Sequence, residues 1–121
     1  MILNLTQHKS TPEQGVTDLA PDMRDVLVRL LTVDTIPTVE EIEARCADIA
    51  YLASEAFDEP PKYAMIGGAP WMMARLERAL IEQGIEPLYA FSVRESTEQV
   101  QPDGSVRKVA VFKHAGFIPA R

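Results

Sequence analysis

Uncharged hydrogen-bonding side chains gather where the first apolar segment of the chain ends. The sequence begins MILNLTQHKSTPEQ, which places Asn4, Thr6, Gln7 and His8 close together. Amide and hydroxyl groups of this kind could orient a ribose or a base. Histidine is the side chain whose unperturbed pKa lies near neutrality, so the imidazole of His8 could act as a general acid. The alternative interpretation is a turn before a helix, in which these side chains bond only to the nearby backbone.

A pair of glycines marks a second candidate site. The segment IGGAP puts Gly67 and Gly68 between an apolar run and Pro70. Two glycines let the backbone approach a ligand closely, and the free amides of a helix start suit an anion. The segment is neither a GxGxxG fingerprint nor a GxxxxGK[ST] loop, so it does not indicate dinucleotide or nucleoside-triphosphate chemistry. Alternatively, the glycines serve only the geometry of a tight turn.

Ser92 and Arg94 form a third candidate group. They continue the alternation of the predicted strand 88–93, so their side chains share one face of the sheet. An arginine beside a serine hydroxyl suits phosphate or carboxylate recognition. The alternative is an exposed hairpin position at which Arg94 pairs with Glu95 or Glu98.

The sequence gives little support for a metal site or a disulfide. His8 and His114 are the only histidines and do not form an HxxxH motif, and Cys46 is the only cysteine. We therefore expect no metal and no cofactor. His114 follows the last predicted strand and could contact a second subunit, fold over the site or lie solvated at the sheet edge.

The spacing of apolar residues predicts the elements that carry these groups. Periodicity of two or short apolar runs indicate strands, and apolar residues at helical spacing after capping residues indicate helices. A single helical turn capped by Thr11 precedes the first long helix, in which the apolar spacing leaves Arg24 outside. Thr38 begins a capping box for the next helix, whose apolar stripe is Ile42, Cys46, Ile49, Ala50 and Ala53, so we expect Cys46 to be a buried, inert thiol. The strands are predicted at Met1–Leu5, Tyr63–Ile66, Leu88–Val93 and Val106–Phe112, and the helices at Pro21–Val33, 39–56 and 70–83.

The order of these elements predicts one α/β domain over residues 1–121, a small Rossmann-like fold of three layers. Strands separated by helices require crossovers, which give a mostly parallel sheet of about four strands. The turn at Pro102-Asp103-Gly104-Ser105 makes the last two strands a hairpin at one edge. Ligands of open parallel sheets bind at the carboxyl ends of the strands. All three candidate groups follow strands at those ends.

Composition narrows the classes of partner. The chain is 46% hydrophobic and 25% charged, as in a soluble globular protein, and its net charge of −6 argues against binding to duplex nucleic acid. A small phosphorylated ligand remains compatible with that charge. With no signal-peptide pattern and no apolar run of membrane-spanning length, we expect a cytoplasmic protein without a membrane partner. An unpaired first or last strand would offer a homodimer surface.

Three stretches carry a resemblance to known families: LNLTQHKSTPEQ, AMIGGAPWMMARLERALIEQGIEPLYAFS and DGSVRKVAVFKHAGF. Together they resemble a family of short uncharacterised proteins of bacteria and their phages, over most of the chain. The first stretch and the order of elements also resemble, more faintly, small Rossmann-like CRISPR-associated proteins and viral ring nucleases. Those enzymes degrade cyclic oligoadenylates, usually as homodimers with the ligand across the two-fold axis.

The second resemblance implies metal-independent cleavage, in which a ribose 2′-hydroxyl attacks the adjacent phosphate. His8 would be the acid, with Arg94 and the amides of Gly67 and Gly68 on the phosphate. Positioning would fall to Thr6, Gln7 and Ser92, with Asn4 beside them at the ligand. Some viral ring nucleases carry a catalytic histidine where this chain has Gly67-Gly68-Ala69, so the resemblance favours nucleotide binding over cleavage. The alternatives are a non-catalytic nucleotide-binding protein and a host–phage interaction protein.

Overall fold

The computed structural model describes all residues from 1 to 121 and has a five-stranded mixed sheet at its centre. The strands lie in the order β2-β1-β3-β4-β5. The pairings of β1 with β2, β1 with β3 and β3 with β4 are parallel, whereas β4 and β5 pair as an antiparallel hairpin. The strands are β1 (Ile2–Asn4), β2 (Thr17–Asp18), β3 (Tyr63–Ile66), β4 (Glu86–Val100) and β5 (Val106–Pro119).

This architecture confirms the predicted α/β class, the mostly parallel sheet and the carboxyl-terminal hairpin. The strand β2 was not predicted, because it has only two residues and no apolar run. The first strand, β1, was predicted at a possible edge of the sheet, but β2 covers that side of β1. The edges of the sheet are therefore β2 and β5.

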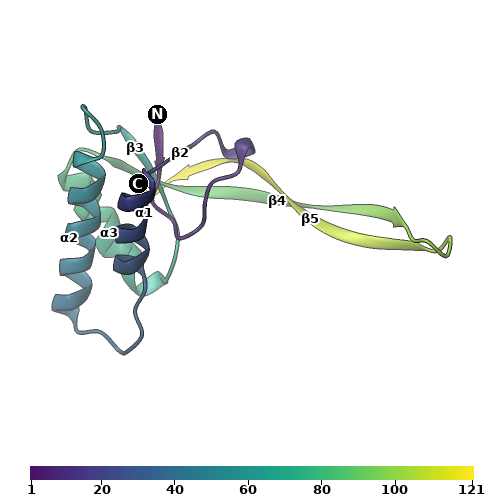
Figure 1. Cartoon of the computed structure of the whole chain (residues 1–121), viewed down its shortest axis with the longest axis horizontal. Coiled ribbons are helices and arrows are strands. Elements are labelled where there is room, and N and C mark those ends of the chain that lie inside the picture. The colour runs from purple at the N-terminus through teal and green to yellow at the C-terminus, as the bar shows by residue number, and fades with distance from the viewer.

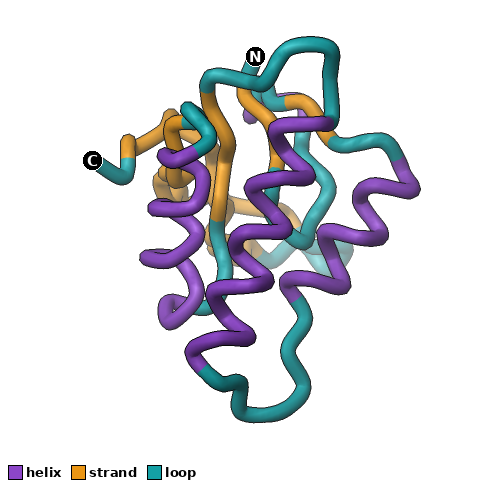
Figure 2. Tube along the Cα trace, turned by 90° about the vertical axis from the view of Figure 1, so that its left-hand side faces the viewer, coloured by secondary structure: helices purple, strands orange, loops and turns teal.

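Three helices lie side by side on one face of the sheet (Figure 2). They are α1 (Pro21–Leu31), α2 (Val39–Glu55) and α3 (Pro70–Glu82). The connection from β2 to β3, which carries α1 and α2, and the connection from β3 to β4, which carries α3, run in the same direction across the sheet, and right-handed crossovers then put every helix on one face. The connection from β1 to β2 runs the other way but carries only the single turn η1 (Pro12–Gln14). The expected second helical layer is therefore absent, and the prediction of three layers was wrong.

The local signals for the helices are confirmed. The Oγ1 of Thr38 accepts a hydrogen bond from the amide of Glu41 at 3.1 Å, which caps α2. At η1, the amide of Thr11 donates to the Oε1 of Gln14 at 3.1 Å. The predicted apolar stripe of α2 is buried in full, in a core of sixteen residues that α2 shares with α1, α3 and the sheet.

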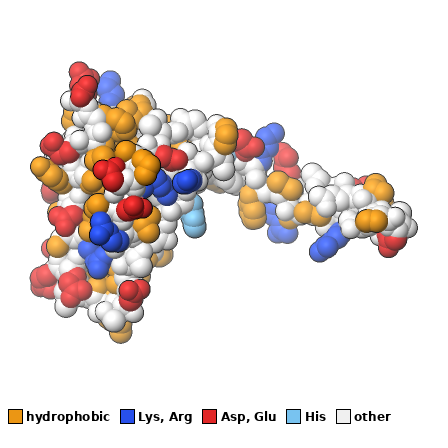
Figure 3. Space-filling model, in the orientation of Figure 1, with side chains coloured by type: hydrophobic (Ala, Val, Ile, Leu, Met, Phe, Trp, Pro, Cys, Tyr) orange, Lys and Arg blue, Asp and Glu red, His pale blue; other side chains and the backbone are white.

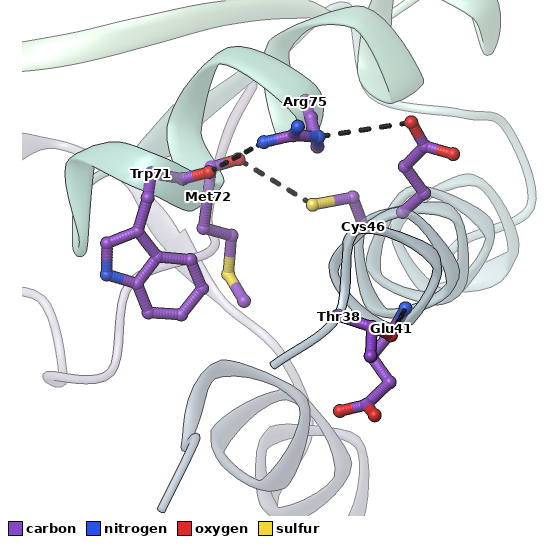
Figure 4. Close-up of polar contacts among 7 residues, drawn as sticks. Thr38, Glu41, Cys46, Trp71, Met72 and Arg75 are labelled. Carbon is purple, nitrogen blue, oxygen red and sulfur yellow. Dashed lines mark hydrogen bonds and ion pairs between the residues drawn. The ribbon is translucent and has the colours of Figure 1, made fainter. Parts of the chain in front are cut away.

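Contacts between α2 and α3 fix the position of α3 (Figure 4). The thiol of Cys46 donates to the carbonyl oxygen of Met72 at 3.7 Å, and Arg75 approaches Glu43 at 3.9 Å. Burial raises the pKa of the Cys46 thiol, so the group stays protonated at neutral pH. The predicted burial of Cys46 is confirmed.

The hairpin of β4 and β5 extends far beyond the body of the protein (Figure 1). The predicted turn is confirmed: the amide of Gln101 donates to the carbonyl of Ser105 at 2.7 Å, and Gly104 has φ of 84°. Both strands are about twice as long as predicted. The outer half of β4, residues 94–100, is mostly polar, and the inner half of β5, residues 113–119, contains Gly116 and Pro119, so neither half carries an apolar strand pattern. We call residues 90–117 the arm. None of the three helices is both long and apolar enough to cross a membrane.

Candidate functional site

A cavity of about 530 Å³ opens at the carboxyl ends of β1 and β3, beside Tyr89 and Ala90 of β4. Its wall combines the loop after β1, the turn after β3, residues of η1 and the point at which β4 leaves the body. The side chains that line it include one cation, Lys9, and one imidazole, His8, but no aspartate or glutamate. The lining residues are Thr6, Gln7, His8, Lys9, Thr11, Gln14, Met65, Ile66, Gly67, Gly68, Tyr89 and Ala90.

The side chain of Asn4 holds the loop after β1 from below. Asn4 is fully buried, and its Nδ2 donates to the carbonyl oxygen of His8 and to the Oδ1 of Asp18, both at 2.8 Å. Its Oδ1 accepts from the amide of Thr6 at 2.9 Å and from the hydroxyl of Thr6 at 2.7 Å. The whole hydrogen-bonding capacity of the amide is used. Asn4 therefore shapes the loop that presents Thr6 and His8, and it does not line the cavity.

Asp18 of β2 holds both ends of the loop after β1. Its Oδ1 accepts a hydrogen bond from the Nδ2 of Asn4 and another from the amide of Ser10 at 3.2 Å. Burial raises the pKa of Asp18. The hydrogen bonds from Asn4 and Ser10 and the charge of Arg24 outweigh that effect, so the pKa lies below the ordinary 3.8. The carboxylate is thus held in its charged form beneath the site.

Arg24 of α1 supports the same loop from the helical side. The apolar spacing of α1 predicted an outward position for this residue, but its side chain is buried, with 9% exposed. Its Nη2 donates to the carbonyl oxygen of Gln7 at 3.0 Å. Its Nη1 is buried without an acceptor in the chain. The helical periodicity of α1 gave no signal for this residue, because the carbonyl that it binds belongs to a loop.

The turn after β3 forms the floor of the cavity. Gly68 has φ of 155°, which an L side chain rarely adopts, whereas a Cβ at Gly67 would meet only the Cγ2 of Thr6 at 3.7 Å. The start of α3 offers few free donors. Pro70 has no amide hydrogen, and the amides of Met72 and Met73 both donate to the carbonyl of Ala69. Lys9 is therefore a better partner for an anion here than the first turn of α3.

Tyr89 joins the wall of the cavity to α3. Its hydroxyl donates to the Oε2 of Glu77 at 2.6 Å. Burial and the neighbouring carboxylate raise the pKa of Tyr89 well above its ordinary value. The phenol stays protonated across the physiological range and fixes the point at which β4 leaves the body.

Two further hollows continue from this cavity, one beside the turn after β3 and the next between the segment 33–37 and the start of α3. Gln7, Gly67 and Gly68 border both the first cavity and a second one of about 320 Å³. Trp71 borders the second and also a third of about 540 Å³, beside the segment 33–37. The indole of Trp71 is 44% exposed and points away from the contacts between α2 and α3 (Figure 4). The three hollows together form an extended groove.

The structure brings together some of the predicted site residues and separates others. Thr6, Gln7, His8, Gly67 and Gly68 share one cavity. Ser92 and Arg94 are exposed and stand on the arm instead, with Arg94 roughly 13 Å along the strand from Ala90 at about 3.3 Å per residue. The structure contains no group of three or more His, Cys, Asp or Glu side chains that could hold a metal ion.

His114 lies at the base of the arm, opposite Ser92 and next to a shift in the register of the two strands. Its ring packs edge-on against Phe117, with 4.9 Å between the ring centroids, and its Nδ1 is buried without a partner. It does not line the cavity of its own chain.

The chain matches one family model across residues 1–118. It belongs to the Uncharacterized protein MJ1673 family. This match confirms the expected relation to an uncharacterised family over most of the chain. No curated protein and no solved structure matched this member of the MJ1673 family. The likeness to ring nucleases stays a prediction, and the function proposed below rests on the geometry of the groove.

Proposed function

We propose that the groove at the carboxyl ends of β1 and β3, beside the start of the arm, binds a small nucleotide. The observation that carries this proposal is the charge of the first cavity. The chain as a whole has a net charge of −6, yet this cavity is lined by Lys9 and His8 without any carboxylate. Its volume of about 530 Å³ lies within the range of small-ligand sites. A phosphate beside Lys9 and a ribose or base beside Thr6 and Gln7 fit these donors and acceptors.

The extension of the groove favours a ligand with more than one nucleotide unit. The exposed indole of Trp71 borders two of the three hollows and offers a flat apolar face to a base. Stacking of a base on an aromatic side chain contributes about 1–3 kcal/mol and tolerates different bases. A short linear or cyclic oligonucleotide would place a phosphate at Lys9 and a base at Trp71.

Metal-independent cleavage of a cyclic oligoadenylate is the second candidate function, and the position of His8 in the cavity supports it. The 2′-oxygen of a ribose would form a bond to phosphorus while the bond from phosphorus to the 5′-oxygen breaks. His8 would protonate the leaving 5′-oxygen, and the 2′-hydroxyl proton would pass to water. The products would be a 2′,3′-cyclic phosphate and a free 5′-hydroxyl. No carboxylate lines the cavity to take the 2′-hydroxyl proton, so binding is the better supported function.

A thermal-shift screen tests the binding proposal. The wild-type protein is heated with mononucleotides, cyclic dinucleotides, and linear and cyclic oligoadenylates. A ligand at about 100 times its dissociation constant stabilises the folded state by roughly 2.7 kcal/mol, which gives a measurable rise in Tm. Titration calorimetry then gives the affinity of each compound that shifts Tm. If none of these compounds raises Tm at millimolar concentration, the nucleotide proposal is wrong.

Gly67→Ala is the matched variant for this experiment. The added methyl group makes only an ordinary contact, 3.7 Å from the Cγ2 of Thr6, so the Tm of the free protein should stay close to that of the wild type. The same methyl group occupies space at the floor of the cavity. We therefore expect Gly67→Ala to weaken ligand binding at least tenfold. Unchanged affinity would place the ligand elsewhere in the groove.

A further inference from the structure

The arm is exposed on both of its faces. Every residue from Ala90 to Val100 is exposed to solvent, and so are most residues of the opposing strand. The exposed side chains include Val100 at 77% and Phe112 at 72%. A two-stranded ribbon with nothing packed on it is marginally stable in water at best. The arm is therefore a surface that a partner would stabilise.

The two edges of the arm differ in charge. The outer edge belongs to β5, whose charged residues are all cations: Arg107, Lys108 and Lys113. Lysine-rich edges resist pairing, and a second copy of β5 would bring like charges together. The other edge belongs to β4. It is free from Ala90 onward, because the pairing with β3 ends at Tyr89.

The sequence along the free edge of β4 is complementary to itself in the antiparallel direction. It reads Arg94-Glu95-Ser96-Thr97-Glu98. In an antiparallel pair of β4 strands centred on Ser96, Arg94 lies opposite Glu98 of the partner subunit, and Glu98 lies opposite Arg94 of the partner subunit. Opposite charges in directly facing positions stabilise a sheet, and the small Ser96 faces its own copy at the centre.

We propose that two copies of this chain pair through the β4 edges of their arms, in antiparallel register centred on Ser96. The pairing extends the two ribbons into one four-stranded antiparallel sheet in the order β5-β4-β4-β5. It satisfies backbone donors and acceptors of the free edge over about nine residues, from Ser92 to Val100. The interface is isologous and closes as a dimer, since each free β4 edge is used once.

The distribution of charge also favours a second copy as the partner. The arm contains four of the twelve cationic and three of the eighteen acidic side chains of the chain, so it is slightly positive while the body is strongly negative. Figure 3 shows many acidic side chains over the body, and basic side chains interspersed with a few acidic ones along the arm. In the proposed dimer each arm runs toward the body of the other subunit, which brings these opposite charges together.

The same register brings the tip of each arm to the groove of the other subunit. Val100 of the partner subunit lies opposite Ser92, so the hairpin turn that follows reaches past Phe91 toward Ala90 and Tyr89. Both of these residues line the first cavity. The dimer therefore places a segment of the second subunit over the mouth of the candidate site. This consequence rests on the proposed function, whereas the dimer itself does not.

Measurement of mass in solution tests the proposed pairing on the full chain. Sedimentation and light scattering should give about 27 kDa for the wild type, twice the 13.4 kDa of one chain. Arg94→Glu puts two glutamates opposite each other at both ends of the interface, so it should raise the dimer dissociation constant about tenfold or more. Glu98→Arg should do the same through facing arginines. Arg107→Glu makes the same change of charge on β5 as Arg94→Glu makes on β4, and it should leave the dimer intact.

Mixing the two charge variants gives the decisive result. In a heterodimer of Arg94→Glu with Glu98→Arg, both facing pairs are again of opposite charge, so the mixture should recover the mass of the dimer. Recovery also shows that both variants are folded. A monomeric wild type at high protein concentration would overturn the proposal. So would a dimer that Arg94→Glu leaves unchanged, or a mixture that stays monomeric. None of these outcomes depends on a nucleotide.

Discussion

The Nη2 of Arg24 lies 3.0 Å from the carbonyl oxygen of Gln7 and donates a hydrogen bond to it. This bond joins α1 to the loop after β1, which carries His8 and Lys9 into the first cavity. The guanidinium is buried, and its charge also helps to keep Asp18 ionised. Arg24 is thus a positioning residue for the loop, although it does not line the cavity itself.

We expect Arg24→Ala to loosen this loop. Loss of a buried hydrogen bond from a charged donor costs about 1.5–3 kcal/mol of unfolding free energy, and the affinity of the groove for its ligand should fall with it. Arg29→Ala is the control, since Arg29 is an exposed arginine of the same helix and its loss should change stability by less than about 0.5 kcal/mol. Denaturant unfolding of both variants measures the difference. Equal stability of the two would contradict the role assigned to Arg24.

Asn4→Ala should be the most destabilising single substitution in the loop. It leaves the amide of Thr6 and the carbonyl of His8 without the partners that Asn4 supplies in the buried site. We expect a loss of about 2–3 kcal/mol, and so a fall in Tm of roughly 5–10 °C. Thr17→Ala removes an exposed side chain of the neighbouring strand β2 and serves as the control in the same thermal melts. A fall in Tm no larger than that of Thr17→Ala would show that the loop does not depend on Asn4.

The lowered pKa of Asp18 implies that the free energy of unfolding decreases at acidic pH. Its pKa is lower in the folded state than the ordinary 3.8, so near that pH the unfolded chain binds more protons than the folded one. Its contribution is therefore complete well above pH 3.8 and is lost as the pH falls through the folded pKa. Unfolding free energies measured between pH 7 and pH 3 should fall more steeply for the wild type than for Asp18→Asn. If the unfolding free energies of the wild type and Asp18→Asn fall in parallel, Asp18 is not the source of the pH dependence.

The parts of the fold that the sequence predicted are those with local or periodic signals. The capping residue Thr38, the apolar stripe of α2 and the run Tyr63–Ile66 each define one element by themselves. The strand β2 could not be predicted in this way, because two residues carry no periodicity. The single helical layer depends on the order of the strands, which becomes known only when their pairings are seen.

Part of the candidate site could also be predicted from the sequence, but the prediction failed for Arg94. The rule that ligands meet the carboxyl ends of parallel strands grouped Thr6 and His8 with Gly67 correctly. The rule failed for Arg94, because β4 stops pairing with β3 at Tyr89 but continues into the arm as far as Val100. Arg94 therefore lies on the arm and not at the cavity. The buried position of Arg24 depends on the carbonyl of a distant loop, and helical periodicity contains no information about that contact.

His8→Ala separates binding from cleavage at the candidate site. The imidazole lines the cavity while its backbone carbonyl holds the loop, so removal of the side chain leaves the loop bonds from Asn4 and Thr6 in place. We expect ligand affinity to stay within about tenfold of the wild type and cleavage of cyclic oligoadenylate to be abolished, because the leaving oxygen loses its acid. His114→Ala is the matched control, since this second histidine lies outside the cavity. Chromatography of the products with calorimetry of the same samples measures both quantities. Equal cleavage by His8→Ala and wild type would remove His8 from the mechanism, and binding without cleavage by the wild type would leave the groove as a nucleotide-binding site alone.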